Sequence, residues 1–261
     1  MQHWIRFALC AAIGAAGCGS SSGSPSDAQQ GGMGGYGVEL PTAESLFPEK
    51  VGNSWTYLVT PVAVELPSYK VVTIAALETV GGTGNSAARP AFRHVTCKSA
   101  PTIEACSMPA SLTNRIDTTI GWLGMADKTL GNYREEAYKK GTDLLTEEDW
   151  WEPHRIKIDM NPAHTVAGAT WIDTYKEFKH GTGGVITSTT QNEKWTVVAV
   201  DQTITVTPPG GAPKTYPGCI QVSHSNNSGS MTKNFWYARG IGKVKETGAQ
   251  TEELIDYKVQ P

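Results

Sequence analysis

Residues 185–224 read VITSTTQNEKWTVVAVDQTITVTPPGGAPKTYPGCIQVSH. Valine, isoleucine and threonine, which favour strands, are frequent on both sides of the turn sequence Pro208-Pro209-Gly210-Gly211. This stretch therefore predicts two long strands, at residues 185–207 and 215–224, joined by a turn.

Working outward from this stretch, strand-forming segments recur at short intervals from residue 54 onward. Further strands are predicted at residues 54–66, 68–78, 89–97, 115–124, 131–139, 153–160, 169–179, 231–239, 242–247 and 251–259, with glycine-rich turns between many of them. Helix is expected only at residues 142–150 and, for one turn, at 109–113. The sequence thus predicts an all-β fold of mostly antiparallel sheet, as an open barrel or a sandwich, with one or two short helices.

The N-terminus is typical of an exported protein. Arg6 precedes an apolar run that ends at Gly17 and is too short to span a membrane. Cys18 completes the sequence Ala-Ala-Gly-Cys, which resembles the bacterial lipobox, although Ala15 stands where an aliphatic residue is usual. We therefore expect a signal peptide at residues 1–17 and acylation of Cys18, including palmitate. The alternative is an ordinary secretory signal that leaves a soluble, secreted protein.

The Gly/Ser-rich sequence around and after Cys18 is typical of a disordered tether, which we place at residues 18–40. Gly19 stands where an Asp often retains lipoproteins at the inner membrane, so the outer membrane of a bacterium is favoured. Residues 41–261 are expected to form a single β-rich extracytoplasmic domain. The expected location is the cell envelope, with the membrane contacted through the lipid anchor.

The charge balance is mildly acidic. The 261 residues contain 22 Lys and Arg against 25 Asp and Glu. Loss of residues 1–17 would remove Arg6 and leave a net charge of 21 − 25 = −4. Because the sequence has no basic stripe, nucleic acid is not an expected partner. After residue 17 no apolar run is long enough for a transmembrane helix.

Three cysteines remain for the folded domain. Cys97 and Cys106 are separated by eight residues, which suits a disulfide across a hairpin or loop in an oxidising compartment. Cys219 would then be a buried free thiol, and the alternative pairs Cys219 with one of the other two. No Cys-x-x-Cys motif is present to predict thiol redox chemistry.

Residues 147–155 gather four carboxylates, two indoles, His154 and Arg155. Carboxylates beside an aromatic surface are typical of glycan-cleaving enzymes, so a hydrolase acting through this cluster is one hypothesis. Neighbouring carboxylates on one loop seldom flank a bond at the required distance. The favoured interpretation is therefore a solvated helix end whose tryptophans plug the mouth of a barrel, and no catalytic residue is assigned.

Other motifs predict no cofactor and no metal. The histidines His94, His154, His164, His180 and His224 lack the spacing of metal ligands. His164 and His180 could meet across a hairpin, but they would be two ligands without a third. The sequence Gly240-Ile241-Gly242-Lys243 lacks the remainder of a phosphate-binding loop, and a hairpin turn explains it.

The aromatic residues are more typical of core layers than of ligand contacts in such a fold. A second interpretation places five tryptophans around an apolar cavity inside an open barrel: Trp150, Trp151, Trp171, Trp195 and Trp236. A continuous apolar cavity would favour a carrier of an apolar ligand, whereas a filled interior would exclude one.

Two stretches resemble a family of uncharacterised bacterial lipoproteins. Residues 46–57, LFPEKVGNSWTY, are similar to the start of that family's domain. Residues 235–246, FWYARGIGKVKE, resemble its closing hairpin, and residues 216–222 resemble the strand before it. The resemblance implies a β-rich extracytoplasmic domain, distantly like the open barrels that ferry lipoproteins between membranes. It implies a fold and no particular chemistry.

A weak internal echo links Gly52-Asn53-Ser54-Trp55 with Gly168-Ala169-Thr170-Trp171. Two similar β-meanders or chance would each explain it. Taken together, these patterns predict a lipid-anchored cell-envelope lipoprotein that acts as a non-enzymatic binding or interaction module, with an envelope protein or an apolar ligand as partner. The alternatives are the carrier of an apolar ligand and the hydrolase.

Overall fold

The computed structural model describes residues 45–62, 66–81, 88–106, 118–139, 142, 144–180, 184, 186–226 and 232–260. The expected signal peptide, Cys18 and the tether lie outside these residues. So does the single helical turn expected at residues 109–113.

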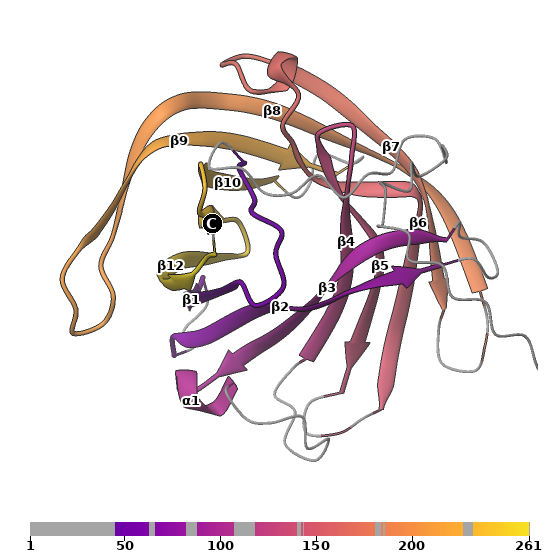
Figure 1. Cartoon of the computed structure of the whole chain (residues 1–261), viewed down its shortest axis with the longest axis horizontal. Helices are drawn as coiled ribbons and strands as arrows, with labels where there is room; N and C mark the ends of the chain where they lie inside the picture. Colours follow the sequence, from indigo (N-terminus) through magenta and orange to yellow (C-terminus); the bar gives the residue numbers. More distant parts are fainter. Residues whose placement is uncertain are drawn as a thin grey trace, which may run out of the picture. The chain divides into compact units, whose positions relative to one another are not determined.

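Twelve strands form one closed barrel (Figure 1). Their bounds are β1 Ser54–Pro61, β2 Ser68–Val80, β3 Arg89–Ala100, β4 Thr118–Ala126, β5 Thr129–Tyr138, β6 Leu145–Asp159, β7 Thr170–His180, β8 Ile186–Val206, β9 Lys214–Ser225, β10 Thr232–Ala238, β11 Gly242–Thr247 and β12 Gln250–Lys258. Each strand pairs with its neighbours in the chain, and β1 pairs antiparallel with β12 to close the ring. The predicted all-β, antiparallel fold is confirmed. It is a closed barrel, neither the open barrel nor the sandwich considered from the sequence.

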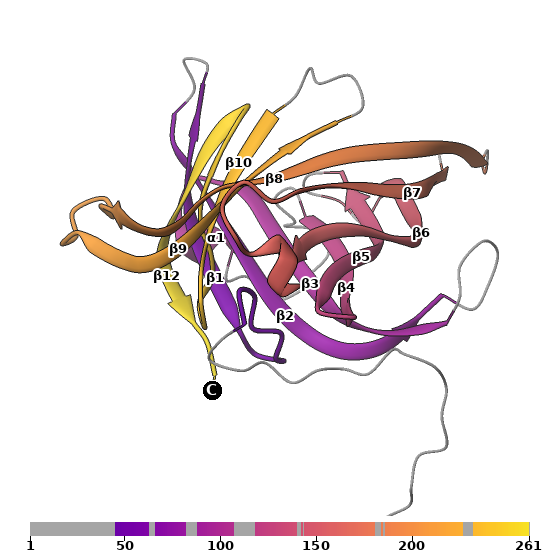
Figure 2. The ribbon, with the colours of Figure 1, turned by 90° about the horizontal axis from the view of Figure 1, so that it is seen from above.

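Side chains alternate between the interior and the exterior of the barrel. In β8, Glu193, Trp195 and Val197 are buried, whereas Lys194 and Val198 are exposed. Because successive side chains of a strand point to opposite faces, one set fills the barrel and the other faces outward. The strands β8 and β9 form a hairpin whose turn, residues 207–213, projects from the barrel (Figure 1 and Figure 2).

Two apolar clusters fill part of the interior and meet at Phe47, which packs against both. The first contains Trp55, Tyr57, Ile74, Phe92, Val206, Tyr216, Cys219, Ala238, Val244, Leu254 and Ile255. The second contains Leu46, Leu123, Leu130, Ile158, Trp195, Val197, Ile220, Val222 and Tyr237. The segment that precedes β1 therefore belongs to the core rather than to the surface.

The segment of residues 45–53 closes one end of the barrel, which we call the plug end, and Figure 1 shows it in indigo inside the ring of strands. The amide of Gly240 donates to the Ser45 carbonyl at 2.7 Å. The Trp55 indole donates to the Ile241 carbonyl at 2.5 Å, and the Tyr57 hydroxyl donates to the Lys243 carbonyl at 3.1 Å. The two stretches that carry the family resemblance thus contact each other, which gives both a shared structural role in closing the barrel.

The expected helix at residues 142–150 is wrong, because the described residues from Leu145 onward belong to β6. Glu147 and Glu148 lie opposite residues 137 and 136 of β5, and Glu148 also lies opposite His180 of β7. Pairing on both sides of β6 overrides the helical preference of the local sequence. The described helical turns are α1, Ile103–Cys106, and a 3-10 turn at Pro162–His164.

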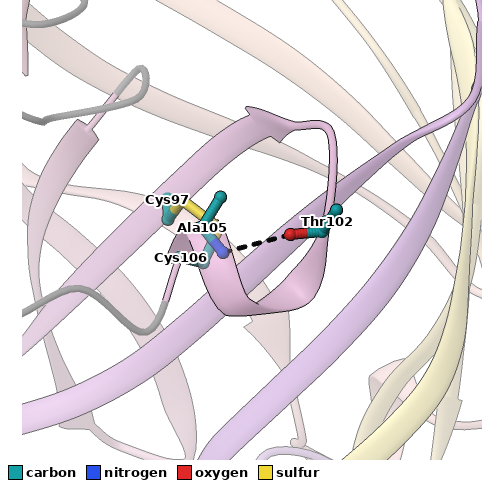
Figure 3. Close-up of a disulfide and its surroundings, with 4 residues drawn as sticks. All are labelled: Cys97, Thr102, Ala105 and Cys106. Atoms are coloured by element: carbon teal, nitrogen blue, oxygen red, sulfur yellow. Dashed lines mark hydrogen bonds between the residues drawn. A yellow bond between two sulfur atoms is a disulfide. The ribbon is translucent and has the colours of Figure 1, made fainter.

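A disulfide joins Cys97 of β3 to Cys106 of α1, as the spacing of the two residues predicts (Figure 3). The hydroxyl of Thr102 accepts a hydrogen bond from the amide of Ala105 at 3.3 Å and caps this short helix. Cys219 is a buried free cysteine, as expected, and burial raises the pKa of its thiol to about 11. The alternative pairing of Cys219 does not form.

The two halves of the sequence echo have the same local structure. Gly52 donates its amide to the Ile74 carbonyl of β2, and Gly168 donates to the Val197 carbonyl of β8. In return, the amide of Ile74 donates to residue 53 and the amide of Val197 to residue 169. Both glycines have a positive φ, +93° and +84°, which suits glycine because it has no Cβ. Each turn leads into the first strand of a six-strand set, β1–β6 or β7–β12.

Candidate functional site

The barrel interior contains a cavity of about 820 Å³. All twelve strands and Phe47 contribute to its lining. On most strands alternate residues line it, as the two-residue period of a strand predicts, whereas on β6 four consecutive residues, 155–158, line it beside a register shift in the pairing with β5. We therefore take this cavity as the candidate functional site.

The wall of the cavity is apolar at the plug end. Phe47 and Trp55 line it there, with ring centroids 5.0 Å apart. The other apolar lining residues at this end belong to the clusters that Phe47 joins: Leu123, Leu130, Ile158, Trp195, Phe235 and Tyr237. Phe47 therefore forms the floor of the cavity.

A first charged network lines the opposite end, where β11 joins β12. The Nζ of Lys70 lies 2.8 Å from Glu252, and the Nζ of Lys243 lies 2.7 Å from the same carboxylate. Lys243 also pairs with Glu246, and Lys233 lies 3.0 Å from Glu246. Two carboxylates thus neutralise two of the three lysines. The network carries one excess positive charge.

The ion pairs keep the groups of this network ionised. Burial alone would raise the pKa of Glu252, but Lys243 and Lys70 hold it well below its usual range. Burial would likewise lower the pKa of Lys243, and Glu252 and Glu246 raise it instead. Lys70 differs, because burial and the neighbouring charge of Lys243 lower its pKa to about 8.

A second charged network links β6, β8 and β9. Glu193 of β8 lies 2.9 Å from the Nη2 of Arg155 and 3.0 Å from the Nε2 of His224. Burial opposes ionisation of Glu193, but the nearby His224 ring and the charge of Arg155 lower its pKa to about 2. The His224 ring packs against Trp195 in a tilted arrangement, with ring centroids 4.5 Å apart, so this network borders the apolar floor.

Lys157 of β6 also lines the cavity, and it differs from the networks around it. Among the described residues, no hydrogen-bond or ion-pair partner for its Nζ is found. Burial, the main cause, and the nearby charge of Arg155 lower its pKa to about 8. This lysine faces the cavity as an ammonium without a carboxylate partner.

The structure disperses the five tryptophans named from the sequence. Trp195 lines the cavity. Trp151 is buried and donates to Glu177, a cavity residue, at 3.1 Å. Trp171 stacks on Trp195, while Trp236 donates to the side chain of Gln202. The remaining one, Trp150, lines a different hollow.

That second hollow has a volume of about 550 Å³ and includes outward-facing side chains of β3–β6. The Arg134 guanidinium lies between the rings of Trp122 and Trp150, at 4.6 Å and 4.7 Å from their centroids. Glu148 accepts from Arg134 at 2.9 Å and from the Trp150 indole at 3.0 Å. Within the described residues, these groups satisfy one another, so they offer a ligand little hydrogen-bonding capacity.

The acidic cluster at residues 147–155 is split between two faces of β6. Glu148 and Trp150 face the outer hollow, whereas Asp149 and Trp151 point to the opposite face, as the period of a strand requires. Glu147 lies 3.0 Å from Lys179. Glu148 and Asp149 therefore point to opposite faces and cannot flank one glycosidic bond.

The histidines are also dispersed. His164 lies in the 3-10 turn before β7 and contacts Asp159 at 2.6 Å, whereas His180 is the last residue of β7 and contacts Glu148 at 3.4 Å. In the described ranges no group of three or more His, Cys, Asp or Glu side chains is arranged to hold a metal ion. Residues 239–241 form the β10–β11 turn, and Lys243 points inward to the first network.

Sequence reasoning did not assign Trp55 to a site, and of the charged lining residues it named only Arg155 and Lys243, each in another context. The strand pattern could have identified Trp55, because it alternates with Tyr57 and Val59 on the buried face of β1. It could not have identified the pair of Lys70 and Glu252, which are 182 residues apart and meet only when the barrel closes.

The fold and this interior define a class: a closed antiparallel barrel with an internal cavity of mixed polarity. The chain matches no known family model, and no curated protein or solved structure shows significant similarity to it. Within the described part of the chain, no helix has the length and hydropathy needed to cross a membrane.

Proposed function

We propose that this protein is a non-enzymatic binding protein of the bacterial cell envelope that holds a small amphipathic molecule inside its barrel. The cavity of about 820 Å³ carries the proposal. Its volume lies in the range of about 300–1,000 Å³ that small-molecule sites occupy. Barrels of eight strands have interiors just wide enough for their own side chains or one small ligand, so twelve strands leave additional room.

The lining favours an amphipathic ligand over a wholly apolar one. Phe47, Trp55 and their neighbours offer an apolar surface at the plug end. Ion pairs around Glu252 and Glu193 line other parts of the same cavity. An apolar chain would gain from the floor, but it would leave the charged wall unused. A molecule with an apolar body and a polar head complements both parts.

The placement of the carboxylates supports binding rather than hydrolysis. Glu193, Glu246 and Glu252 are each held in ion pairs with lysine or arginine. A carboxylate fixed in this way is a poor general acid, because neighbouring cations keep it ionised. The charges of the cavity therefore suit recognition of a ligand.

The envelope location rests on the sequence around Cys18. Intact mass of the membrane-extracted protein is expected to show acylation that Cys18→Ala removes, together with release of the variant from membranes. Unchanged membrane association of Cys18→Ala would contradict the lipid anchor, and it would leave the cavity proposal to its own test.

The binding proposal is tested by filling the cavity. Val72 lines it, so Val72→Trp would place an indole in the space that a ligand needs. The matched control is Val198→Trp, since Val198 is 48 % exposed on the outside of β8. The readout is fluorescence of Nile red, a neutral apolar dye, with dodecyl amphiphiles as competitors.

We expect saturable dye binding, displaced by the amphiphiles, in the wild type and in Val198→Trp, and its loss in Val72→Trp. Circular dichroism and the melting temperature would establish that both variants are folded. Equal dye binding by the two folded variants, or no binding by the wild type, would overturn the proposed function.

A further inference from the structure

The cavity contains more cationic than anionic side chains. Six basic groups line it: Lys70, Lys98, Arg155, Lys157, Lys233 and Lys243. Five carboxylates line it: Glu135, Glu177, Glu193, Glu246 and Glu252. With histidines neutral, the lining carries a formal charge of 6 − 5 = +1.

The carboxylates of the cavity all have donors within the protein. Glu193, Glu246 and Glu252 pair with cations, as described above. Glu177 accepts hydrogen bonds from the Trp151 indole at 3.1 Å and from Gln191 at 3.0 Å. Glu135 accepts from the side chain of Asn132 at 3.3 Å. At Glu193, Glu246 and Glu252, a cationic ligand would have to compete with an existing cationic partner.

Two of the basic groups, Lys98 and Lys157, have no carboxylate within ion-pair distance among the described residues. Of the two, Lys157 is the one that charged groups on several strands surround. Its ammonium interacts with charges on three other strands, namely Glu135 of β5, Glu193 of β8 and Lys233 of β10. Arg155, on the same strand, also interacts with this ammonium. Of these four charges, those of Arg155 and Lys233 repel it.

An anion beside Lys157 would offset the repulsion from Arg155 and Lys233 and would accept hydrogen bonds from the free ammonium. A hydrogen bond to a charged group is stronger than one between neutral groups, and it is stronger still away from bulk water. The lowered pKa of Lys157 agrees with this geometry, because burial and the charges of Arg155 and Lys233 outweigh the attraction of Glu135 and Glu193.

We propose that the cavity selects amphiphiles with an anionic head, which Lys157 binds while the apolar body lies on the floor formed by Phe47 and Trp55. This inference rests on the proposed function and names the class of its ligand. The expected chemistry is a single carboxylate, or a head of similar charge, on an apolar chain.

The experiment compares three ligands that share a twelve-carbon chain. They are laurate with an anionic head, dodecanol with a neutral head and dodecyltrimethylammonium with a cationic head. Binding to the purified protein at pH 7 is measured by calorimetry and by displacement of Nile red. We expect laurate to bind at least about tenfold more tightly than dodecanol, and the cationic ligand to bind most weakly.

The variant Lys157→Met keeps most of the side-chain length and removes the charge. It is expected to weaken laurate binding by about tenfold and to leave dodecanol binding unchanged. The matched control is Lys194→Met, because Lys194 is exposed on the outer face of β8 and has no ion pair with a described residue. Lys194→Met should bind all three ligands as the wild type does.

Equal affinities of the wild type for laurate and dodecanol, or an equal loss of both in Lys157→Met, would overturn the anionic-head inference and leave the proposed function standing. Failure of all three ligands to bind would overturn the proposed function itself. Should Lys157→Met not fold, the comparison of the three head groups on the wild type still decides the preference for an anion.

Discussion

At the scale of single residues, Lys157 is expected to affect both the stability of the protein and the binding of the proposed ligand. Its pKa is lowered from an ordinary 10.5 to about 8, chiefly by burial and then by Arg155. The groups that face it from other strands are Glu135, Glu193 and Lys233. Between pH 8 and 10.5 the unfolded chain binds a proton at this lysine that the folded chain does not, so stability rises with pH in that window.

Lys157→Met removes this penalty and should therefore stabilise the protein. At pH 7, where the penalty is complete, we expect the free energy of unfolding to rise by about 3 kcal/mol. The gain should shrink as the pH approaches 10.5. Urea unfolding of both proteins at pH 7 and pH 10 measures it. A gain of equal size at both pH values would mean that packing, rather than charge, explains the effect.

The sequence predicts some residue-scale features and not others for a simple physical reason. Cys97 and Cys106 are close in the chain, so their spacing favours this pair over the alternative with Cys219. Glu252, the partner of Lys70, is 182 residues away and becomes its neighbour only when β1 pairs with β12 to close the barrel. No local pattern encodes that pairing. Lys157 differs from Lys70 because no described carboxylate pairs with it, and the sequence does not show this either.

At the scale of elements, β6 illustrates the limit of local propensity. The acidic and leucine-containing sequence near its start favours a helix, but pairing with β5 and β7 makes it a strand. The remaining described strands agree with their predictions. In these strands the local preference of β-branched residues and of glycine-rich turns is the same as the structure that the whole barrel requires. The change at β6 also has a consequence for function, since it separates the carboxylates that a helix end would have grouped.

The disulfide gives a prediction at this scale. It closes the connection from β3 to α1, with a sequence separation of nine residues. Replacing both Cys97 and Cys106 with Ser should lower the free energy of unfolding by about 2–3 kcal/mol, since the unfolded chain gains freedom. Chemical denaturation with and without reductant measures this loss. Reductant should destabilise the wild type to the level of the double variant and leave the variant unchanged, whereas a wild type indifferent to reductant would contradict the prediction.

At the scale of the whole molecule, the barrel has an internal correspondence between two sets of six strands. Gly52 and Gly168 make matching hydrogen bonds to Ile74 and Val197 in the following strand of each set. The echo in the sequence therefore coincides with a repeated structural element. The two sets differ at their beginnings, because the residues before Gly52 contribute Leu46 and Phe47 to the core.

That difference makes residues 45–53 the element that determines the depth of the cavity. Phe47 lines the cavity and packs against Trp55. Leu46, in the same segment, is buried with 1 % of its surface exposed, and it does not line the cavity. Phe47→Ala should therefore deepen the cavity, and Leu46→Ala should not. Both variants should lose about 2–4 kcal/mol of stability, since both remove core contacts.

Comparing the two variants distinguishes an effect of cavity depth on ligand binding from an effect of lost protein stability. The quantity compared is the ratio of the affinity for palmitate to the affinity for laurate. If the apolar body of a ligand rests on Phe47, this ratio should be higher in Phe47→Ala than in the wild type, by roughly fourfold for each additional methylene that becomes buried. Leu46→Ala should keep the wild-type ratio despite its similar loss of stability. Calorimetric titration of both fatty acids into the three proteins gives these ratios. An unchanged ratio in Phe47→Ala would place the apolar body elsewhere in the barrel, because the space opened at the floor would then be out of the ligand's reach.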